Sequence, residues 1–163
     1  MANTIDLFIG LGVSFLNFGI HAVMTALIVV TTRRAETRTH HHGIFVRLTA
    51  LLTVSVSILM FAHVAEIAVW AALLDIMGVR IANIDVFEFA FENYTALGYG
   101  DALPKDVRYR LLGPVMALNG LLLIGWSVAV IFEVMRMAEF EVGKRRVGKE
   151  CQSVCRSRWS PYH

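Results

Sequence analysis

The stretch ENYTALGYGDALP (residues 92–104) lies between two strongly apolar parts of this 163-residue chain. It combines two glycines, two tyrosines, two carboxylates and a proline. A stretch this polar and flexible is unusual between segments of such hydrophobicity. Its meaning depends on what the flanking segments are.

Three long segments of the chain are almost free of charge. Hydrophobic residues make up 56% of the sequence and charged residues 17%, whereas about a quarter of an average soluble domain is charged. Residues 7–31 contain no Asp, Glu, Lys or Arg, residues 48–74 contain only Glu66, and residues 111–136 carry charges only near their end. Each meets the length of about 20 residues that a helix needs to cross a bilayer. A soluble bundle would need polar helix faces, which these segments lack. We therefore expect an all-α integral membrane protein, folded as a single domain over residues 1–163, with three transmembrane helices.

The basic residues predict how the chain is oriented. Eleven of the 15 Lys and Arg residues lie between the first two segments or in residues 136–163, and the other four lie between the second and third segments. Because Lys and Arg concentrate on the cytoplasmic side, the N-terminus should lie outside and the C-terminus in the cytoplasm. This favours a multi-pass protein of the plasma membrane. A signal peptide is a poorer interpretation of the first segment, because no positive charge precedes it and its apolar run is too long.

The connection between the second and third segments should contain a short helix. Residues 85–95 begin with Asp85, which can cap the free amides, and Glu88 follows three residues later. The residues after Asp85 are mostly apolar, yet the helix is too short to span a membrane. We expect it to re-enter the membrane partway. Irregular backbone at such depth is tolerated only inside protein or beside a watery path, which suggests a pore.

The stretch TALGYGD (residues 95–101), followed by Pro104, resembles the selectivity filter of potassium channels. The resemblance covers roughly residues 50–136, with the first span outside it, and is nearest to small bacterial-type members with three spans and one pore motif. It implies a pore helix at 85–95, an extended filter at 96–101 and an inner helix at 111–136. It also implies a homotetramer with potassium as the permeant ion and no other metal or cofactor. The implied ion ligands are the backbone carbonyls of Ala96, Leu97, Gly98, Tyr99 and Gly100.

The glycines have a physical role in such a filter. Successive carbonyls point at one axis only if the backbone alternates between ordinary and left-handed conformations, which Gly98 and Gly100 permit. Tyr99 would point away from the axis and wedge against a pore helix. The alternative is a glycine-rich surface loop, in which the motif has no such function.

One residue of the filter departs from the family's usual pattern, and a second residue near it has two possible roles. The family's usual innermost threonine is Ala96 here, and Thr95 lies one step earlier, so the hydroxyl ligands are missing and potassium preference should weaken. Glu92 stands where some members carry an acid that pairs with the motif's Asp101 behind the filter. It could equally face the outer vestibule as an ordinary carboxylate.

Two glycines of the third segment, Gly120 and Gly125, are candidates for a gating hinge. Gly120 falls where the inner helix of the family often has its hinge glycine. Close packing of small residues between helices explains glycine at these positions as well.

His63 and Glu66 share a helix face inside the second segment. An ionisable residue within a membrane is a functional candidate by default. The pair could be a proton-sensitive switch, a brace to the pore helix, or a structural pair without regulatory meaning. Counting inward from the helix ends predicts that Asn17 of the first span bonds to His63, at about 1 kcal/mol.

The basic tail, residues 137–163, should contact anionic lipid, since juxtamembrane Lys and Arg contribute about 1 kcal/mol each. Nothing in it suggests a nucleic-acid surface. His40, His41 and His42 lie among arginines of the first connector, where a solvated loop is the simplest interpretation. Cys151 and Cys155 alone are a weak zinc signal.

Taken with the resemblance, the sequence predicts a potassium-selective channel that conducts passively and is not an enzyme. One alternative is a weakly selective monovalent cation channel, which Ala96 would permit. Another is a non-conducting subunit that modifies a different pore. A membrane enzyme using His63 and Glu66 is the remote alternative.

Overall fold

The computed structural model describes residues 4–38, 44–98 and 102–158. Within them the chain forms three long helices, one short helix and one 3₁₀ turn. In order these are α1 (Thr4–Arg38), α2 (Ile44–Ile76), α3 (Val86–Tyr94), η1 (Val107–Leu111) and α4 (Leu112–Arg158). No β-strand occurs in these ranges, so the predicted all-α class is confirmed.

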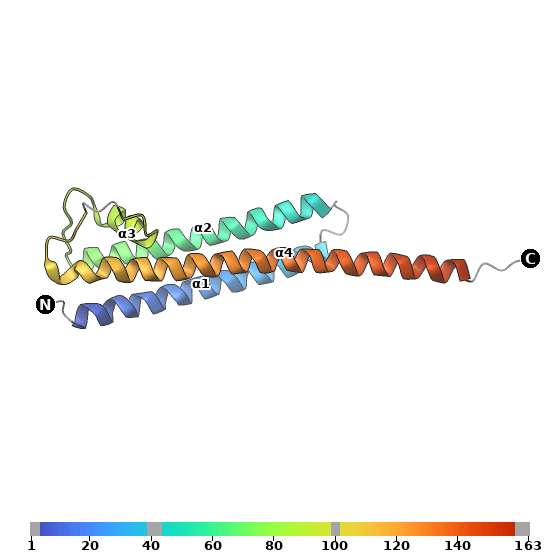
Figure 1. The fold of residues 1–163 in the computed structure, drawn as a ribbon, viewed down its shortest axis with the longest axis horizontal. Coiled ribbons are helices and arrows are strands. Elements are labelled where there is room, and N and C mark those ends of the chain that lie inside the picture. Colours follow the sequence, from blue (N-terminus) through green and yellow to red (C-terminus); the bar gives the residue numbers. More distant parts are fainter. Residues whose placement is uncertain (1–3, 39–43, 99–101, 159–163) are drawn as a thin grey trace, which may run out of the picture.

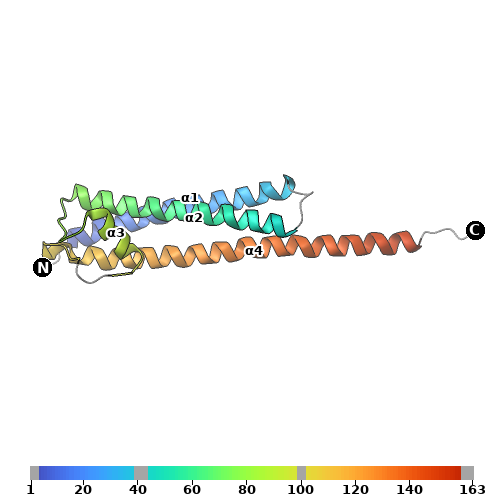
Figure 2. The same ribbon diagram turned by 90° about the horizontal axis from the view of Figure 1, so that it is seen from above.

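The three long helices lie side by side along most of their length, and both views agree on this (Figures 1 and 2). Three stretches are long and apolar enough to cross a membrane: Thr4–Ala35 in α1, Phe45–Ile76 in α2, and Val107–Met137, which comprises η1 and the first part of α4. Large apolar side chains such as Phe15 and Phe132 are 74% and 67% exposed. Such an outer surface suits contact with lipid or with other membrane helices, because exposing this much apolar area to water is unfavourable. The prediction of three long helices suitable for spanning a membrane is confirmed by these segments.

The short helix α3 lies at the end of the molecule where α2 ends and α4 begins, and it packs against both (Figure 1). Phe89, Ala90 and Tyr94 form its buried face. These residues join Trp70 and Met116 in one apolar cluster. The burial of two aromatic side chains holds α3 against the long helices.

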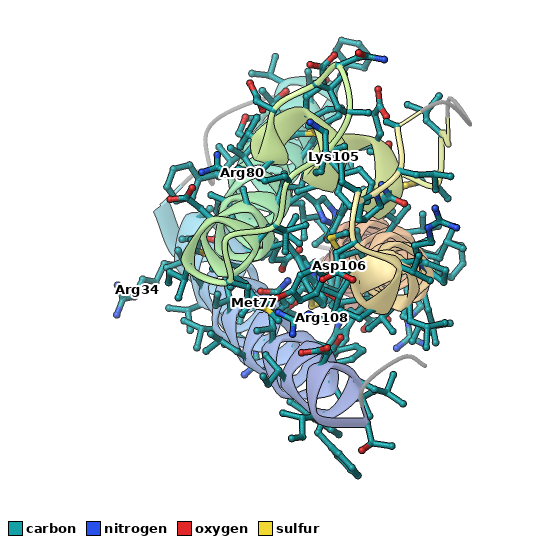
Figure 3. All side chains as sticks on the ribbon, turned by 90° about the vertical axis from the view of Figure 1, so that its left-hand side faces the viewer. Arg34, Met77, Arg80, Lys105, Asp106 and Arg108 are labelled. Atoms are coloured by element: carbon teal, nitrogen blue, oxygen red, sulfur yellow. The ribbon has the colours of Figure 1, made fainter. Side chains whose placement is uncertain are left out.

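The two arms of the connection around α3 are held to each other. Ile81 and Pro104 form an isolated antiparallel bridge, and the amide of Lys105 donates to the carbonyl of Arg80 at 2.9 Å. Figure 3 looks onto this end of the molecule, where Met77, Asp106 and Arg108 lie close together. The segment that leaves α2 and the segment that enters η1 are thus paired beside α3.

The last helix, α4, runs without interruption to Arg158 and extends well beyond the ends of α1 and α2 (Figures 1 and 2). The basic residues expected in a tail from residue 137 are therefore on a continuation of the inner helix. Arg33, Arg34 and Arg47 lie at the same end of the molecule as this extension, because α1 ends and α2 begins there.

Candidate functional site

The start of α3 is capped as the sequence predicts. The carboxylate of Asp85 accepts a hydrogen bond from the amide of Glu88 at 2.8 Å, and Asp85 itself has extended backbone angles. A side-chain acceptor at this position satisfies an amide that has no partner within the helix. The cap sets where α3 begins and therefore where its other end lies.

The end of α3 is a Schellman motif built on alanine. The amide of Leu97 donates to the carbonyl of Glu92 at 3.0 Å, and the amide of Ala96 donates to that of Asn93 at 2.9 Å. This pattern requires a left-handed residue just past the cap, usually glycine. Here that residue is Ala96, with a φ of 56°. The Thr95 hydroxyl donates back to the carbonyl of Phe91 at 2.8 Å.

The structure describes only the first part of the predicted filter. Gly98 has a φ of 51°, so Ala96 and Gly98 both have the left-handed sign while Leu97 between them does not. Tyr99, Gly100 and Asp101 lie outside the described residues, as does any contact between Asp101 and Glu92. The side chain of Glu92 is partly buried. The assignment of filter carbonyls and of the Glu92 partner therefore stays a prediction.

Gly120 of α4 is a point of close approach to α3. A Cβ at Gly120 would lie 1.9 Å from the carbonyl oxygen of Tyr94, which is a backbone atom at the end of α3. A Cβ at Gly125 would meet nothing within 4 Å. Gly120 thus has a clear packing reason to be glycine, whereas the proposed hinge at either position stays a prediction.

Polar side chains from four helices meet around Glu66, which is fully buried. Its carboxylate lies 2.9 Å from Nδ1 of His21 and 3.2 Å from Nδ1 of His63. It also accepts a short hydrogen bond from the hydroxyl of Tyr94. On the far side of both imidazole rings lies Ser127, whose Oγ is 2.9 Å from Nε2 of His63 and 3.3 Å from Nε2 of His21. We call these five residues the Glu66 cluster.

A second group of polar contacts extends the Glu66 cluster toward Asn119 of α4. The Oδ1 atom of Asn119 accepts hydrogen bonds from Trp70 at 3.0 Å and from Asn17 at 3.1 Å. Asn17 is also 3.3 Å from the backbone carbonyl of Glu66. These bonds join α1, α2 and α4 at one level.

The predicted bond between Asn17 and His63 is wrong. Asn17 donates to Asn119 and to the Glu66 carbonyl, and the α1 residue that faces the His63 neighbourhood is His21, one turn further along. Asn17 and His63 are each 13 residues from the nearer ends of α1 and α2, so equal depth alone does not determine which side chain of α1 meets His63. His63 and Glu66 themselves are in contact, as their spacing indicates.

Sequence reasoning missed Tyr94, Ser127, Asn119 and Trp70 as members of this region. Asn119 and Ser127 carried a usable signal, because they are polar residues within an apolar span and must find partners there. Tyr94 and Trp70 carried none, because aromatic residues are common in any apolar helix.

The arrangement has a definite physical consequence. A carboxylate in a protein interior is tolerated only with several hydrogen-bond donors around it. Those donors come here from α1, α2 and α3, so the last turn of α3 is linked through Glu66 to the long helices. Through Tyr94, the last residue of α3, the Glu66 cluster contacts the residue that directly precedes residues 95–98.

Comparison with known proteins agrees with this geometry. No curated protein and no solved structure matches the chain. The family model described as an ion channel matches residues 49–137, which include most of α2, all of α3 and the apolar part of α4 and amount to more than half of the chain. The chain belongs to this ion channel family.

Proposed function

We propose that the protein is a potassium-selective channel, in which four copies surround one pore and potassium passes down its gradient. The observation that carries the proposal is the sequence TALGYGD, which directly follows a capped short helix within an ion channel domain. Backbone carbonyls replace the water shell of potassium in filters of this kind.

The position of α3 supports a re-entrant pore helix. Tyr94 at its end contacts Gly120, which is eight residues inside α4, and His63, which is 13 residues from the end of α2. At 1.5 Å per residue these depths are about 12 Å and about 20 Å, and the hydrocarbon core is about 30 Å thick. With α2 and α4 across a bilayer, the end of α3 would lie about halfway along the span, as a re-entrant pore helix requires.

This placement has an electrostatic advantage for a cation. The C-terminal end of a helix carries a partial negative charge, equivalent to about half an elementary charge. In a tetramer, four such ends would point toward the centre of the membrane. They would stabilise a monovalent cation in a central cavity below the filter.

The tetramer is supported by the apolar surface of α4. Leu118, Leu122 and Val128 are 60%, 52% and 63% exposed, although they lie on the predicted inner helix. One filter strand cannot encircle an ion, so several identical chains related by rotational symmetry would have to form a closed ring. Residues on this surface would line the cavity or contact neighbouring copies.

Orientation and location follow from the same proposal. The ends of α1 and α2 near Arg33, Arg34 and Arg47, with the basic extension of α4, would lie in the cytoplasm. The N-terminus and the connection around α3 would lie on the extracellular side. The membrane would be the plasma membrane. The extension of α4 would contact anionic lipid.

Recording from purified protein in planar bilayers under opposed potassium and sodium gradients tests the function. We expect currents that reverse near the potassium equilibrium potential. Reversal near zero would instead establish the second candidate, a weakly selective cation channel, which Ala96 at the usual threonine position favours. Silence in repeated reconstitutions would contradict both and favour a subunit that modifies another pore.

A variant with a changed filter shows whether the current belongs to this protein. Gly98→Ala should abolish or strongly reduce it, because Gly98 has a left-handed φ of 51° that alanine adopts only at a cost. Gly19→Ala on α1, outside the ion channel domain, is the matched control, since its added methyl meets nothing within 4 Å. Equal currents from both variants would mean that residue 98 is not in the conduction path.

A further inference from the structure

The Glu66 cluster brings together three side chains that bind transition metals, and the hydroxyl of Tyr94 lies beside two of them. The ligand atoms of His21, His63 and Glu66 all lie within 4.8 Å of one another. The contacts to the carboxylate are 2.9 Å for Nδ1 of His21 and 3.2 Å for Nδ1 of His63. The hydroxyl of Tyr94 lies 2.8 Å from the same Nδ1 of His63. Tetrahedral zinc, with bonds of 2.0–2.2 Å, needs neighbouring ligand atoms roughly 3.3–3.6 Å apart, so only small side-chain shifts separate the observed atoms from a zinc site.

The contacts of Ser127 leave the Glu66 cluster one donor short in the protonation state in which both neutral rings donate to Glu66. If both imidazoles are neutral and donate from Nδ1 to Glu66, both Nε2 atoms are acceptors. Both then face Ser127, at 2.9 and 3.3 Å, but its hydroxyl has only one proton. One Nε2 lone pair would face the serine oxygen unmatched, inside the protein.

A metal bound at the two Nδ1 atoms removes this mismatch. Each neutral ring then carries its proton on Nε2, and the oxygen of Ser127 has two lone pairs to accept both. Such a partner behind the ligands is what orients metal-binding histidines in general. The observed contacts of Ser127 with both rings therefore have the pattern of an outer shell of a metal site.

Burial and ligand type limit which metal ions this site would bind. The side chains of His21 and Glu66 are 0% exposed and that of His63 is 16% exposed. A divalent cation would supply the positive charge that the buried carboxylate otherwise lacks, with one positive charge in excess. Imidazole nitrogens with one carboxylate suit zinc and similar transition metals, whereas calcium and magnesium prefer oxygen ligands alone.

We propose that His21, His63 and Glu66 bind a divalent transition-metal ion of the zinc type, with the hydroxyl of Tyr94 as the fourth ligand. The ion would link α1 and α3 to α2, and so connect the first span to the end of the short helix. This site is independent of which ion the pore selects.

The test uses the full chain with its competing ligands removed. His40, His41 and His42 and the two cysteines, Cys151 and Cys155, would bind zinc themselves, so the background protein carries alanines at the three histidines and serines at the cysteines. It is purified in detergent through a tag without histidine. Cobalt(II) is titrated, because its visible absorption reports tetrahedral nitrogen and oxygen ligands, and zinc is then added to displace it. We expect one tetrahedral cobalt ion per chain, which zinc displaces.

Variants at the site separate specific binding from adventitious binding. His21→Gln and Glu66→Gln should each abolish the stoichiometric cobalt spectrum, and Ser127→Ala should weaken binding by about 10- to 100-fold. Thr25→Val is the matched control: it lies on α1 one turn beyond His21, and its hydroxyl has no hydrogen-bond partner among the described residues. It should bind cobalt as the background protein does. Circular dichroism of every variant identifies any that fails to fold.

Two results would overturn the proposal. One is a background protein that takes up no tetrahedral cobalt, in which case the missing donor is a proton held on one imidazole. The other is a folded Glu66→Gln variant that binds cobalt as tightly as the background does. A His63→Gln variant offers the same comparison if Glu66→Gln does not fold.

Discussion

At the scale of single residues, Gly120 is the position where one added carbon has the largest expected effect. Its Cβ would fall 1.9 Å from the carbonyl oxygen of Tyr94. A backbone atom at the end of a capped helix cannot move aside as a flexible side chain does. Replacement therefore requires that α3 and α4 separate.

We expect Gly120→Ala to destabilise the protein by about 1–3 kcal/mol, the usual cost of overpacking. Gly125→Ala, on the same helix with open space around it, should be neutral or stabilising by up to about 1 kcal/mol. Thermal unfolding in detergent, followed by circular dichroism, measures both. Equal stability of the two variants would contradict the close approach between α3 and α4.

A second residue-scale prediction concerns the hydroxyl of Tyr94. It donates to the buried carboxylate of Glu66, and removal of a donor from a buried charge costs about 1.5–3 kcal/mol. Tyr94→Phe should lower the free energy of unfolding by this amount. Tyr109→Phe is the matched control, because its hydroxyl makes only a long 3.4 Å contact with the carbonyl of Met77 and one with the exposed Arg108. A larger loss in Tyr109→Phe would argue against the Glu66 cluster as a stabilising centre.

At the scale of elements, the chain ends two helices in the same way with different residues. The amides of Gly78 and Val79 close the end of α2 onto Asp75 and Leu74, each at 2.9 Å. The end of α3 has the same bonds, but its left-handed residue is Ala96, with φ 56°, where α2 has Gly78, with φ 66°. A left-handed residue with a Cβ costs roughly 1–2 kcal/mol.

We expect Ala96→Gly to stabilise the protein by about 1 kcal/mol and Gly78→Ala to destabilise it by a similar amount. Chemical unfolding of both variants, each compared with the unchanged chain, provides the measurement. If Ala96→Gly proved destabilising, the left-handed turn after α3 would be excluded. The same variant in bilayers would show whether a strained residue 96 affects conduction.

The elements also show which features the sequence can reveal. The cap at Asp85 was predictable, because a capping acid acts on amides within its own turn. The left-handed Ala96 was not, because alanine rarely adopts that conformation and no local signal marks it. The partner of Asn17 was missed for another reason: it depends on the axial register of α1 against α4, which packing along the whole helix determines.

At the scale of the whole molecule, three apolar helices and one paired connection account for the shape (Figures 1 and 2). The length of an apolar run is a local property, so the spans were predictable from sequence. How His21, Tyr94 and Ser127 meet around Glu66 was not, because they come from three other helices. Residues 99–101 of the predicted filter lie outside the described residues. Their role as ion ligands is inferred from the sequence motif alone.

The predicted orientation in the membrane can be tested with the native cysteines of the chain. The native cysteines Cys151 and Cys155 should face the cytoplasm, because they belong to the basic extension of α4. A membrane-impermeant thiol reagent should label them in intact cells only after permeabilisation. Ala2→Cys, in a background with both native cysteines replaced by serine, should be labelled without it. Labelling in the reverse pattern would mean that the chain is inserted the other way round.

The most direct test of the pore is a structure of the assembled protein in rubidium or thallium, whose anomalous scattering marks the ion. Four chains around one axis should hold ion density on that axis, ringed by the carbonyl oxygens of residues 96–100. The N-terminal part of this ring should begin at the left-handed turn of Ala96 and Gly98. An assembly without a four-fold axis, or with Gly98 turned toward lipid and no axial ion, would contradict the channel.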